Sequence, residues 1–477
     1  MIAKNQVPVS VGSTVSAGKQ FGRAKLTIFF LSPSRSVLCA LLVGGLLLAV
    51  GCREVDESQA KVAVSSVADE ASNPVIGSRE TFVNSAVNID DAQNVATDPV
   101  ATQVSEIQVS NEQEFAQQDE LTVEQRDRIL FKRTSQAGVA FLLNQGQAKD
   151  GSFSKQLSPA VTALCTSALL EHKIPVADPR IQKSLTFLEG QVKSDGGIYA
   201  VGSNLRNYET SVSLMCFDRA NVDGKYDQTI QKAIAFLKGI QWDEGENHTL
   251  ESTFYGGQGY GSHKRPDASN TSYFMDALRA ADEDPKSEAF QKAATFMARC
   301  QNLSTPSNTA EWASNVTAED RGGFIYTAVG EGESKAESDI EGGLRSYGSM
   351  TYAGLKSFLY AGVDKDDVRV KAAMDWIGRH YDLTTNPGLG QQGLFYYYHV
   401  FAKTLSASGQ DQIVDSAKVA HDWRVDLTAQ LAKLQSQDGS WTNPADRWFE
   451  GDPNLVTAYA MLALSYCDVE PASPSTK

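Results

Sequence analysis

Cysteine is scarce in this chain, with six among 477 residues, and histidine is equally rare. No two cysteines form a Cys-x-x-Cys pair, the arrangement used by many structural zinc sites and redox motifs. We therefore expect no bound metal and no cofactor. Cys165, Cys216 and Cys467 lie in apolar stretches, where a cysteine is usually a small buried hydrophobic residue. A disulfide between two of them remains open.

Basic residues are fewer than acidic ones, 43 lysines and arginines against 58 aspartates and glutamates. The formal net charge is −15, and no basic stripe runs along the sequence. Nucleic-acid binding depends on lysine and arginine side chains that displace counterions from phosphates. The composition therefore predicts that nucleic acid is not a partner.

The sequence has no apolar run of the ~20 residues that a transmembrane helix needs. Residues 36–51 form a shorter run that follows five basic residues and no acidic one, which is typical of an export signal. The run ends in Ala-Val-Gly before Cys52, which resembles the bacterial lipobox, where the cysteine is lipidated. We predict a signal at residues 1–51 and an exported protein, lipid-anchored through Cys52 to a bacterial membrane and facing the periplasm or the cell surface. A plain transmembrane anchor is the alternative.

Aromatic residues are nearly absent from residues 52–120, where Phe82 and Phe115 are the only ones. The same segment contains 14 acidic and three basic residues. It can bury too little apolar surface to offset the entropy lost on folding. We predict that residues 52–120 are a lipidated, acidic, disordered tether, that an ordered domain spans residues 121–470, and that residues 471–477 are a tail.

One helical segment recurs along the predicted domain. Its close copies share a Gln-Lys start, a central Phe and a closing Gln, and they occupy residues 182–191, 231–241 and 291–301, with looser copies around Phe141, Trp376 and Leu431. A glycine-rich turn and a second helix follow each copy. The sequence therefore contains six repeat units.

The second helix of each unit has almost no polar face. Residues 160–170 and 454–464 are apolar or small on all sides, which is typical of buried helices. The first helices have a polar face and so belong to the surface. We predict an all-α fold, an α/α toroid of about six helix-pair repeats with inner and outer rings of helices. A HEAT or TPR solenoid is the competing fold, but its repeats are shorter and more regular.

A motif at residues 431–441 adds a family resemblance. Gln435 is followed by Asp-Gly-Ser-Trp441, which resembles the repeat motif of the squalene cyclases and protein prenyltransferases, the terpenoid cyclase superfamily. The resemblance covers residues 122–467 and implies that the glutamine braces helix ends while the aromatic residue packs against the next repeat. Polysaccharide lyases and complement-like thioester domains use similar toroids, but the Gly-Cys-Gly-Glu-Gln thioester motif is absent.

The acid of squalene cyclases is missing from the aligned position. By resemblance, an Asp-x-Asp-Asp motif at the start of an inner helix should protonate an alkene, but here only Asp267 is retained and Ser269 stands at the proton donor. The residues Asp364 to Asp367 match the pattern but lie in an inner-to-outer turn. We expect them to cap a helix.

The zinc ligands of protein prenyltransferases are missing too. By resemblance, an Asp-x-Cys at the start of one inner helix and a His in the next should bind the metal. Tyr347 and Ser349 align with the first two ligands. His399 lies near the third position without partners that could complete a zinc site, so we expect a hydrogen-bonded core histidine.

The outer-to-inner turns share one rim with the N-termini of the inner helices, where partial positive charge accumulates. Long loops on that rim are suited to binding. We predict an anion or ligand site there, formed by His263, Lys264, Arg265, Asp267, Arg345 and Arg447. We predict that the adjoining cavity is lined by Tyr260, Tyr347, Ser349, Tyr352, Tyr397 and Trp441.

These features predict a membrane-anchored toroid that binds a small apolar or amphipathic ligand, or a protein partner, without the family's known catalysis. Whether the chain is an enzyme stays open. One alternative is an isoprenoid cyclase or transferase with relocated catalytic residues. The other is a carboxylate-dependent polysaccharide lyase or hydrolase, which needs two acids at a defined separation. Its candidate acids on the rim are Glu333, Asp339, Glu341, Glu450 and Asp452.

Overall fold

The computed structural model describes residues 121–261, 265–336 and 343–468. The described residues all belong to one compact unit. The predicted export signal, the lipidation site Cys52, the tether and the tail lie outside the described residues. No helix within the described ranges is long and apolar enough to cross a membrane.

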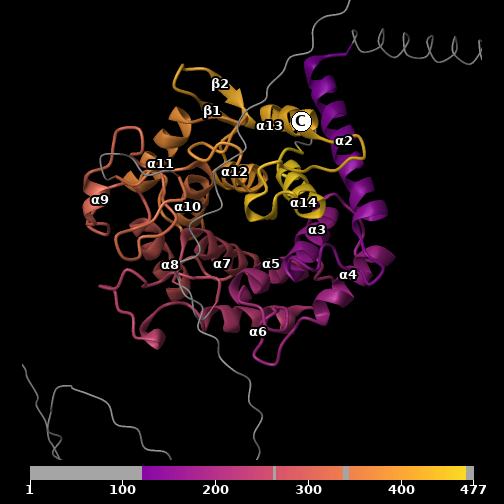
Figure 1. Cartoon of the computed structure of the whole chain (residues 1–477), viewed down its shortest axis with the longest axis horizontal. Helices are drawn as coiled ribbons and strands as arrows, with labels where there is room; N and C mark the ends of the chain where they lie inside the picture. The colour runs from indigo at the N-terminus through magenta and orange to yellow at the C-terminus, as the bar shows by residue number, and fades with distance from the viewer. Residues whose placement is uncertain (1–120, 262–264, 337–342, 469–477) are drawn as a thin grey trace, which may run out of the picture. The chain divides into compact units, whose positions relative to one another are not determined.

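Six helices with one buried face form an outer ring (Figure 1). They are α2 (Val123–Phe141), α4 (Pro179–Glu189), α6 (Asp227–Lys238), α8 (Glu288–Arg299), α11 (Val368–Arg379) and α13 (Trp423–Leu434). In α6 the buried residues are Ile230, Ala233, Ile234 and Leu237, which recur at the helical period. This pattern places one side of the helix against the inner ring and leaves the other in solvent.

Six further helices form the inner ring. They are α3 (Pro159–Glu171), α5 (Arg206–Arg219), α7 (Ala268–Ala280), α10 (Gly348–Tyr360), α12 (Leu394–Ser408) and α14 (Pro453–Leu464). Each contacts the next, and α14 contacts α3, so the ring is closed. In α14 every residue from Asn454 to Leu464 is buried. The predicted α/α toroid of six helix pairs is confirmed.

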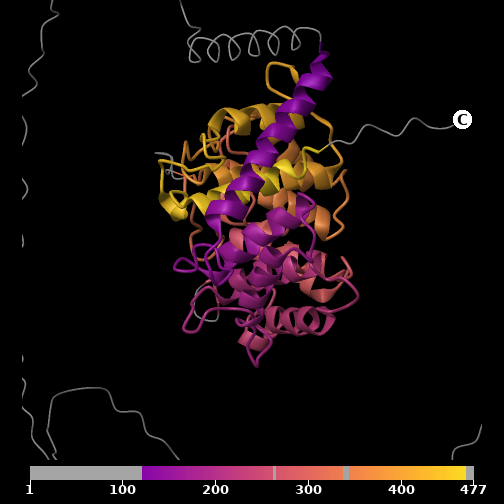
Figure 2. The same ribbon diagram turned by 90° about the vertical axis from the view of Figure 1, so that its right-hand side faces the viewer.

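The ring closes where the first and last repeats meet. Helix α2 packs against α13 and α14, and Figures 1 and 2 show this indigo helix beside the yellow end of the chain. The Gln435 side chain donates to the Thr134 carbonyl of α2 at 3.0 Å. Trp441 is fully buried beside Gly138 of the same helix. The last repeat therefore supplies a neighbour for the first.

A glutamine braces the turn in four of the repeats. The Gln241 Nε2 atom donates to the carbonyl of Gly256 in its own turn at 2.8 Å and to the carbonyl of Ala289 in the next outer helix at 3.1 Å. Gln147, Gln301 and Gln435 make the same pair of contacts. The brace implied by the family resemblance is therefore present.

The turn glycine is required by its backbone. Gly256 has φ +83°, in the left-handed region, and a Cβ there would overlap the carbonyl oxygen of Lys292 in the next outer helix. Only glycine allows the turn to pack this closely against the neighbouring repeat. The turn thus fixes the spacing between repeats.

Acidic and hydroxyl side chains begin several of the helices. Asp178 and Ser158 accept hydrogen bonds at the N-termini of α4 and α3, each just before a proline. Asp367 caps α11 by accepting from the Arg369 amide at 2.8 Å, and Asp364 accepts from the Asp366 amide at 2.7 Å. The predicted capping role of this acidic cluster is confirmed.

Short elements complete the described domain. The helix α9 (Glu311–Ser314) lies between α8 and α10, and a hairpin of β1 (Gln412–Val414) and β2 (Ala420–Asp422) links α12 to α13. The prediction of an all-α fold missed this hairpin because three-residue strands are too short to show an alternating pattern. Among the described residues Cys165, Cys216, Cys300 and Cys467 are buried free thiols, so the disulfide left open by the sequence is not formed.

Candidate ligand site

The predicted anion-binding residues are dispersed over several loops, each with its own partner. Arg265 forms an ion pair with Glu333, Arg345 forms one with Asp320 at 3.2 Å, and Arg447 donates to Gln392. His263 and Lys264 lie outside the described residues. None of these three arginines lines either of two pockets in the described part of the chain, one at an end of the inner ring and one on the outside. The rim site therefore stays a prediction.

Asp267, the remaining acid of the aligned cyclase motif, caps helix α7. It is 1% exposed and accepts from the Asn270 amide at 2.8 Å and the Asn270 side chain at 2.9 Å. Burial raises the pKa of Asp267 to about 6, and these hydrogen bonds only partly oppose that rise. Its carboxylic acid is therefore a weaker proton donor than an ordinary aspartic acid.

The predicted cavity residues are buried or half-buried within the ring. Tyr347, Ser349, Tyr352, Tyr397 and Trp441 are all buried, and Tyr260 is half-buried. The Tyr397 hydroxyl donates to the Asp382 carbonyl and the Trp441 indole to the Leu431 carbonyl, both at 2.8 Å. None of the six lines either reported pocket. Their role as a cavity lining is not tested by these contacts and stays a prediction.

Tyrosines from four inner helices meet inside the ring. The Tyr208 and Tyr273 rings are 4.9 Å apart, Tyr273 and Tyr396 are 6.1 Å apart, and Tyr396 and Tyr459 are 5.9 Å apart. The Tyr208 and Tyr459 hydroxyls approach to 3.3 Å. These side chains come from α5, α7, α12 and α14, so they pack together across the interior of the ring.

His399 is buried beside this tyrosine cluster. Its ring lies 5.9 Å from that of Tyr459, and its Nδ1 atom has no hydrogen-bond partner among the described residues. Burial lowers the pKa of His399 well below its usual range, and Lys403 and Lys356 lower it further. The prediction of a core histidine is confirmed, although its Nδ1 atom makes no hydrogen bond with the described part of the chain.

A buried charge cluster joins three inner helices. The carboxylate of Asp276 on α7 lies 2.7 Å from Lys356 Nζ on α10 and 3.0 Å from Lys403 Nζ on α12. Burial alone would raise the pKa of Asp276, but the two ammonium groups outweigh it and hold that pKa below its usual value. Burial lowers the pKa of Lys356 to about 8. Burial also lowers the pKa of Lys403, and the Asp276 carboxylate opposes that fall.

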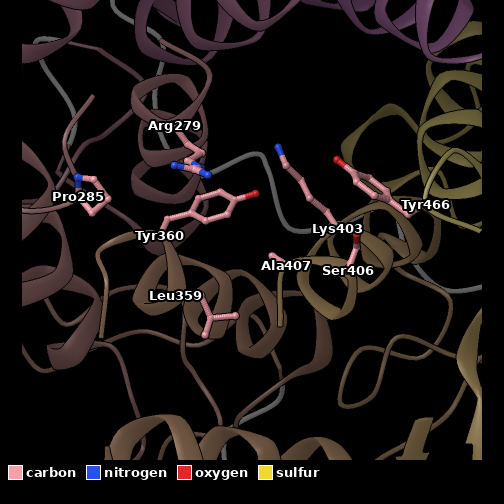
Figure 3. Close-up of a pocket in the computed structure, with 8 residues that line it drawn as sticks. All are labelled: Arg279, Pro285, Leu359, Tyr360, Lys403, Ser406, Ala407 and Tyr466. Atoms are coloured by element: carbon pink, nitrogen blue, oxygen red, sulfur yellow. The ribbon is translucent and has the colours of Figure 1, made fainter. Parts of the chain in front are cut away.

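A pocket of about 390 Å³ opens next to this cluster. Its walls come from the C-terminal ends of α7, α10 and α12 and from the residue two positions beyond α14, as Figure 3 shows. We call it the axial pocket, lined by Arg279, Pro285, Leu359, Tyr360, Lys403, Ser406, Ala407 and Tyr466. It lies at the end of the inner helices opposite to the predicted rim.

The sequence prediction missed the axial pocket, although one signal pointed to it. Asp276, Lys356 and Lys403 are charged residues within inner helices that are otherwise apolar or small. Charged side chains are rarely buried unless they are paired or functional. Three such residues at similar depths in three inner helices would have indicated a shared buried site.

A second, larger groove lies on the outside of the ring. It has a volume of about 1320 Å³ and is bordered by α8, α9 and the loops around them, with Glu251, Arg299 and Trp312 in its lining. Arg299 donates to the Ser252 and Leu250 carbonyls and so holds one of these loops.

No group of three or more His, Cys, Asp or Glu side chains in the described residues is arranged to hold a metal ion.

The geometry defines a class of protein: a closed α/α toroid with a pocket of mixed apolar and polar lining at one end. Residues 133–319, less than half of the chain, match the family model of the squalene-hopene cyclase C-terminal domain. This stretch includes α3, α5 and α7. The resemblance to the squalene cyclase and prenyltransferase superfamily is thereby confirmed, and the chain has a squalene cyclase-like fold.

Solved structures similar to this chain include both terpene cyclases and a polysaccharide lyase. A variant of type II terpene cyclase MstE from Scytonema in complex with geranylgeranyl dihydroxybenzoate is 13% identical, covers 72% of this chain and 98% of its own, and has a TM-score of 0.31. Its apo form is 12% identical over 70% and 97%, with a TM-score of 0.30. The polysaccharide lyase is 12% identical over 72% and 97%, with a TM-score of 0.40. No curated protein sequence matches the chain.

Proposed function

We propose that this chain is a membrane-anchored toroid that binds one amphipathic molecule in the axial pocket and does not alter it chemically. The observation that carries the proposal is the pocket itself. It combines apolar walls, formed by Pro285, Leu359 and Ala407, with the polar ends of Arg279 and Lys403. A mixed lining of this kind suits a ligand with an apolar chain and a polar head group.

Asp267 argues against an isoprenoid cyclase with the family's chemistry. An alkene is a very weak base, so its protonation needs an unusually strong acid. The raised pKa of Asp267 makes it a weaker acid than usual. Ser269, at the aligned donor position, is 3.1 Å from the Tyr396 hydroxyl and has no acidic proton to give.

The rim carboxylates argue against a polysaccharide enzyme. Glu333 is paired with Arg265 and Lys335, and Asp452 caps α14. Glu450 accepts from the Tyr396 amide at 2.8 Å and the Asn443 side chain at 2.7 Å. Each of these acids supports local structure, and none lines the outer groove. Asp339 and Glu341 lie outside the described residues.

Co-purification tests the proposed binding. The full chain is purified, extracted with organic solvent, and the extract is analysed by mass spectrometry. We expect an amphipathic molecule that is recovered with the same mass after prolonged incubation with fresh protein. An empty extract, together with no binding of added single-chain amphiphiles, would contradict the binding proposal. A time-dependent change of mass would contradict the absence of catalysis.

Anchoring is tested separately by Cys52→Ala. Because lipidation at Cys52 is the proposed attachment, the variant is expected to move from the membrane fraction to the soluble fraction. Cys300→Ala, which removes a buried thiol far from the N-terminus, is the matched control and should fractionate like the wild type. A Cys52→Ala protein that still sediments with membranes would contradict the lipid anchor.

A further inference from the structure

The charge cluster below the axial pocket is not balanced. Two ammonium groups, from Lys356 and Lys403, share the single carboxylate of Asp276. Lys356 is 1% exposed and makes the shorter contact, so it neutralises the carboxylate from within the core. The second positive charge, on Lys403, is left without a full partner in the cluster. A buried charge of this kind is costly unless another group compensates it.

The charged side chain of Lys403 borders the axial pocket. Figure 3 shows the ammonium group extending toward the side of the pocket where Arg279 and Tyr360 lie. An ammonium group has three N–H donors. Asp276 Oδ1 lies 3.0 Å from the ammonium group as an ion-pair partner, and the Met215 sulfur at 3.9 Å is a weak acceptor for one of its donors. At least one strong donor of Lys403 is therefore available to a ligand.

Arg279 adds a second available cation. It lies in the last turn of α7, is exposed, and makes no hydrogen bond or ion pair with the described part of the chain. Figure 3 places its guanidinium beside the ring of Tyr360, on the same side of the pocket as the Tyr360 hydroxyl. A guanidinium group presents several N–H donors in a plane, which suits carboxylate and phosphate oxygens.

We infer that the axial pocket selects an amphiphile with an anionic head group, which Arg279 and Lys403 contact directly. The inference rests on the proposed function, which leaves the charge of the head group open. Carboxylate and phosphate oxygens share the chemistry that these two cations recognise. The Tyr360 and Tyr466 hydroxyls lie at the same pocket and can donate to the same oxygens.

The helix C-termini around the pocket disfavour an anion, so the preference for an anionic head group depends on Arg279 and Lys403. The C-termini of α7, α10 and α12 gather there, and the end of a helix carries partial negative charge. Without the cations an anionic head group would meet this negative field with only neutral hydroxyl donors of the pocket to oppose it. Removal of both positive charges should therefore reverse the preference and favour a cationic head group.

Calorimetric titration of the full chain with four probes of equal chain length tests the inference. The probes are octyl phosphate, octanoate, neutral octanol and octyltrimethylammonium. We expect both anions to bind at least about tenfold more tightly than octanol. The order of the two anions identifies a phosphate or a carboxylate head group, and either order supports the inference.

Variants test whether Arg279 and Lys403 cause the preference for an anionic head group. Arg279→Gln removes an exposed, unpaired cation, and Lys403→Met leaves Asp276 paired with Lys356, so both proteins should fold. Each is expected to lose about fivefold or more in anion affinity while octanol binding stays within about twofold. The double variant should bind octyltrimethylammonium more tightly than octyl phosphate. Lys371→Met, which removes an exposed lysine on α11 outside the pocket, is the matched control.

The outcomes separate this inference from the function on which it rests. If octanol binds as tightly as the anions, or if the variants keep the anion affinity of the wild type, the head-group inference is wrong while amphiphile binding stands. If none of the four probes binds, the proposed function fails as well. Loss of anion affinity in Lys371→Met equal to that in Lys403→Met would also overturn the assignment to the pocket.

Discussion

Two buried aspartates, Asp267 at the N-cap of α7 and Asp276 within the helix, show how differently one residue type behaves inside this ring. Asp276 faces two lysines, which hold its pKa below the usual value, and so it stays charged. Asp267 has only hydrogen-bonding partners and a more distant arginine, so burial raises its pKa to about 6. The sequence predicted Asp267 as a site residue from its alignment, but the charge state of either residue depends on neighbours far along the chain.

Asp267→Asn should stabilise the protein at neutral pH. The pKa of Asp267 is raised in the folded state, so its contribution is fully present below about pH 4 and is lost as the pH rises through about 6. Asparagine does not titrate and can still cap α7. The new NH2 group takes the place of the oxygen that accepts from Asn270 Nδ2, so the Asn270 amide must turn over and accept through its Oδ1 atom, which has no partner among the described residues. We expect a free energy of unfolding about 1–3 kcal/mol higher than the wild type at pH 7.5 and similar at pH 4.

Urea denaturation at several pH values measures this difference. A variant less stable than the wild type at pH 7.5, or one with the same pH dependence between 4 and 6, would show that Asp267 is ionised at little cost. The pKa and burial argument for this residue would then be wrong.

At the scale of elements, the repeat was predictable and its interruptions were not. The 3.6-residue period of the outer helices and the apolar inner helices follow directly from burial on one side or on all sides. The glutamine brace followed from the family resemblance. The hairpin of β1 and β2 escaped prediction because its strands of three residues each carry no periodic signal.

Gly256→Ala should be much more destabilising than Gly202→Ala. Both glycines have positive φ, which costs an alanine about 1–2 kcal/mol. At Gly202 no atom lies within 4 Å of the added Cβ, so this is the whole cost. At Gly256 the Cβ overlaps the Lys292 carbonyl and forces α8 away, for a total of about 3–5 kcal/mol. Chemical denaturation of the two variants measures both, and equal losses would refute the packing role of the turn.

At the scale of the whole molecule, closure distinguishes this ring from an open array of repeats. Helix α14 contacts α3, and α2 contacts α13, so each repeat is held on both sides. The closed ring was predictable from the apolar inner helices. The packing of its interior was not, because the four tyrosines that meet there come from helices far apart in sequence, and only their three-dimensional arrangement fills the space.

Trp441→Ala should loosen both ends of the ring. The side chain is fully buried next to α2, and its loss should cost about 3–5 kcal/mol. Because it connects the last repeat to the first, hydrogen exchange is expected to accelerate in α2 as well as in α13 and α14. The control Val201→Ala, at a position 92% exposed, should leave exchange unchanged. Faster exchange confined to α13 and α14 would indicate that the ring is not closed in solution.

The sequence prediction and the proposed function place the ligand at opposite ends of the inner helices. Helix dipoles and long loops favoured the rim at the inner-helix N-termini, whereas the axial pocket lies at the opposite ends of those helices. The most direct measurement is a crystal structure of the chain with octyl phosphate. We expect a head group between Arg279 and Lys403, with the alkyl chain against Leu359. A head group beside Arg265, Arg345 or Arg447 with an empty axial pocket would contradict it.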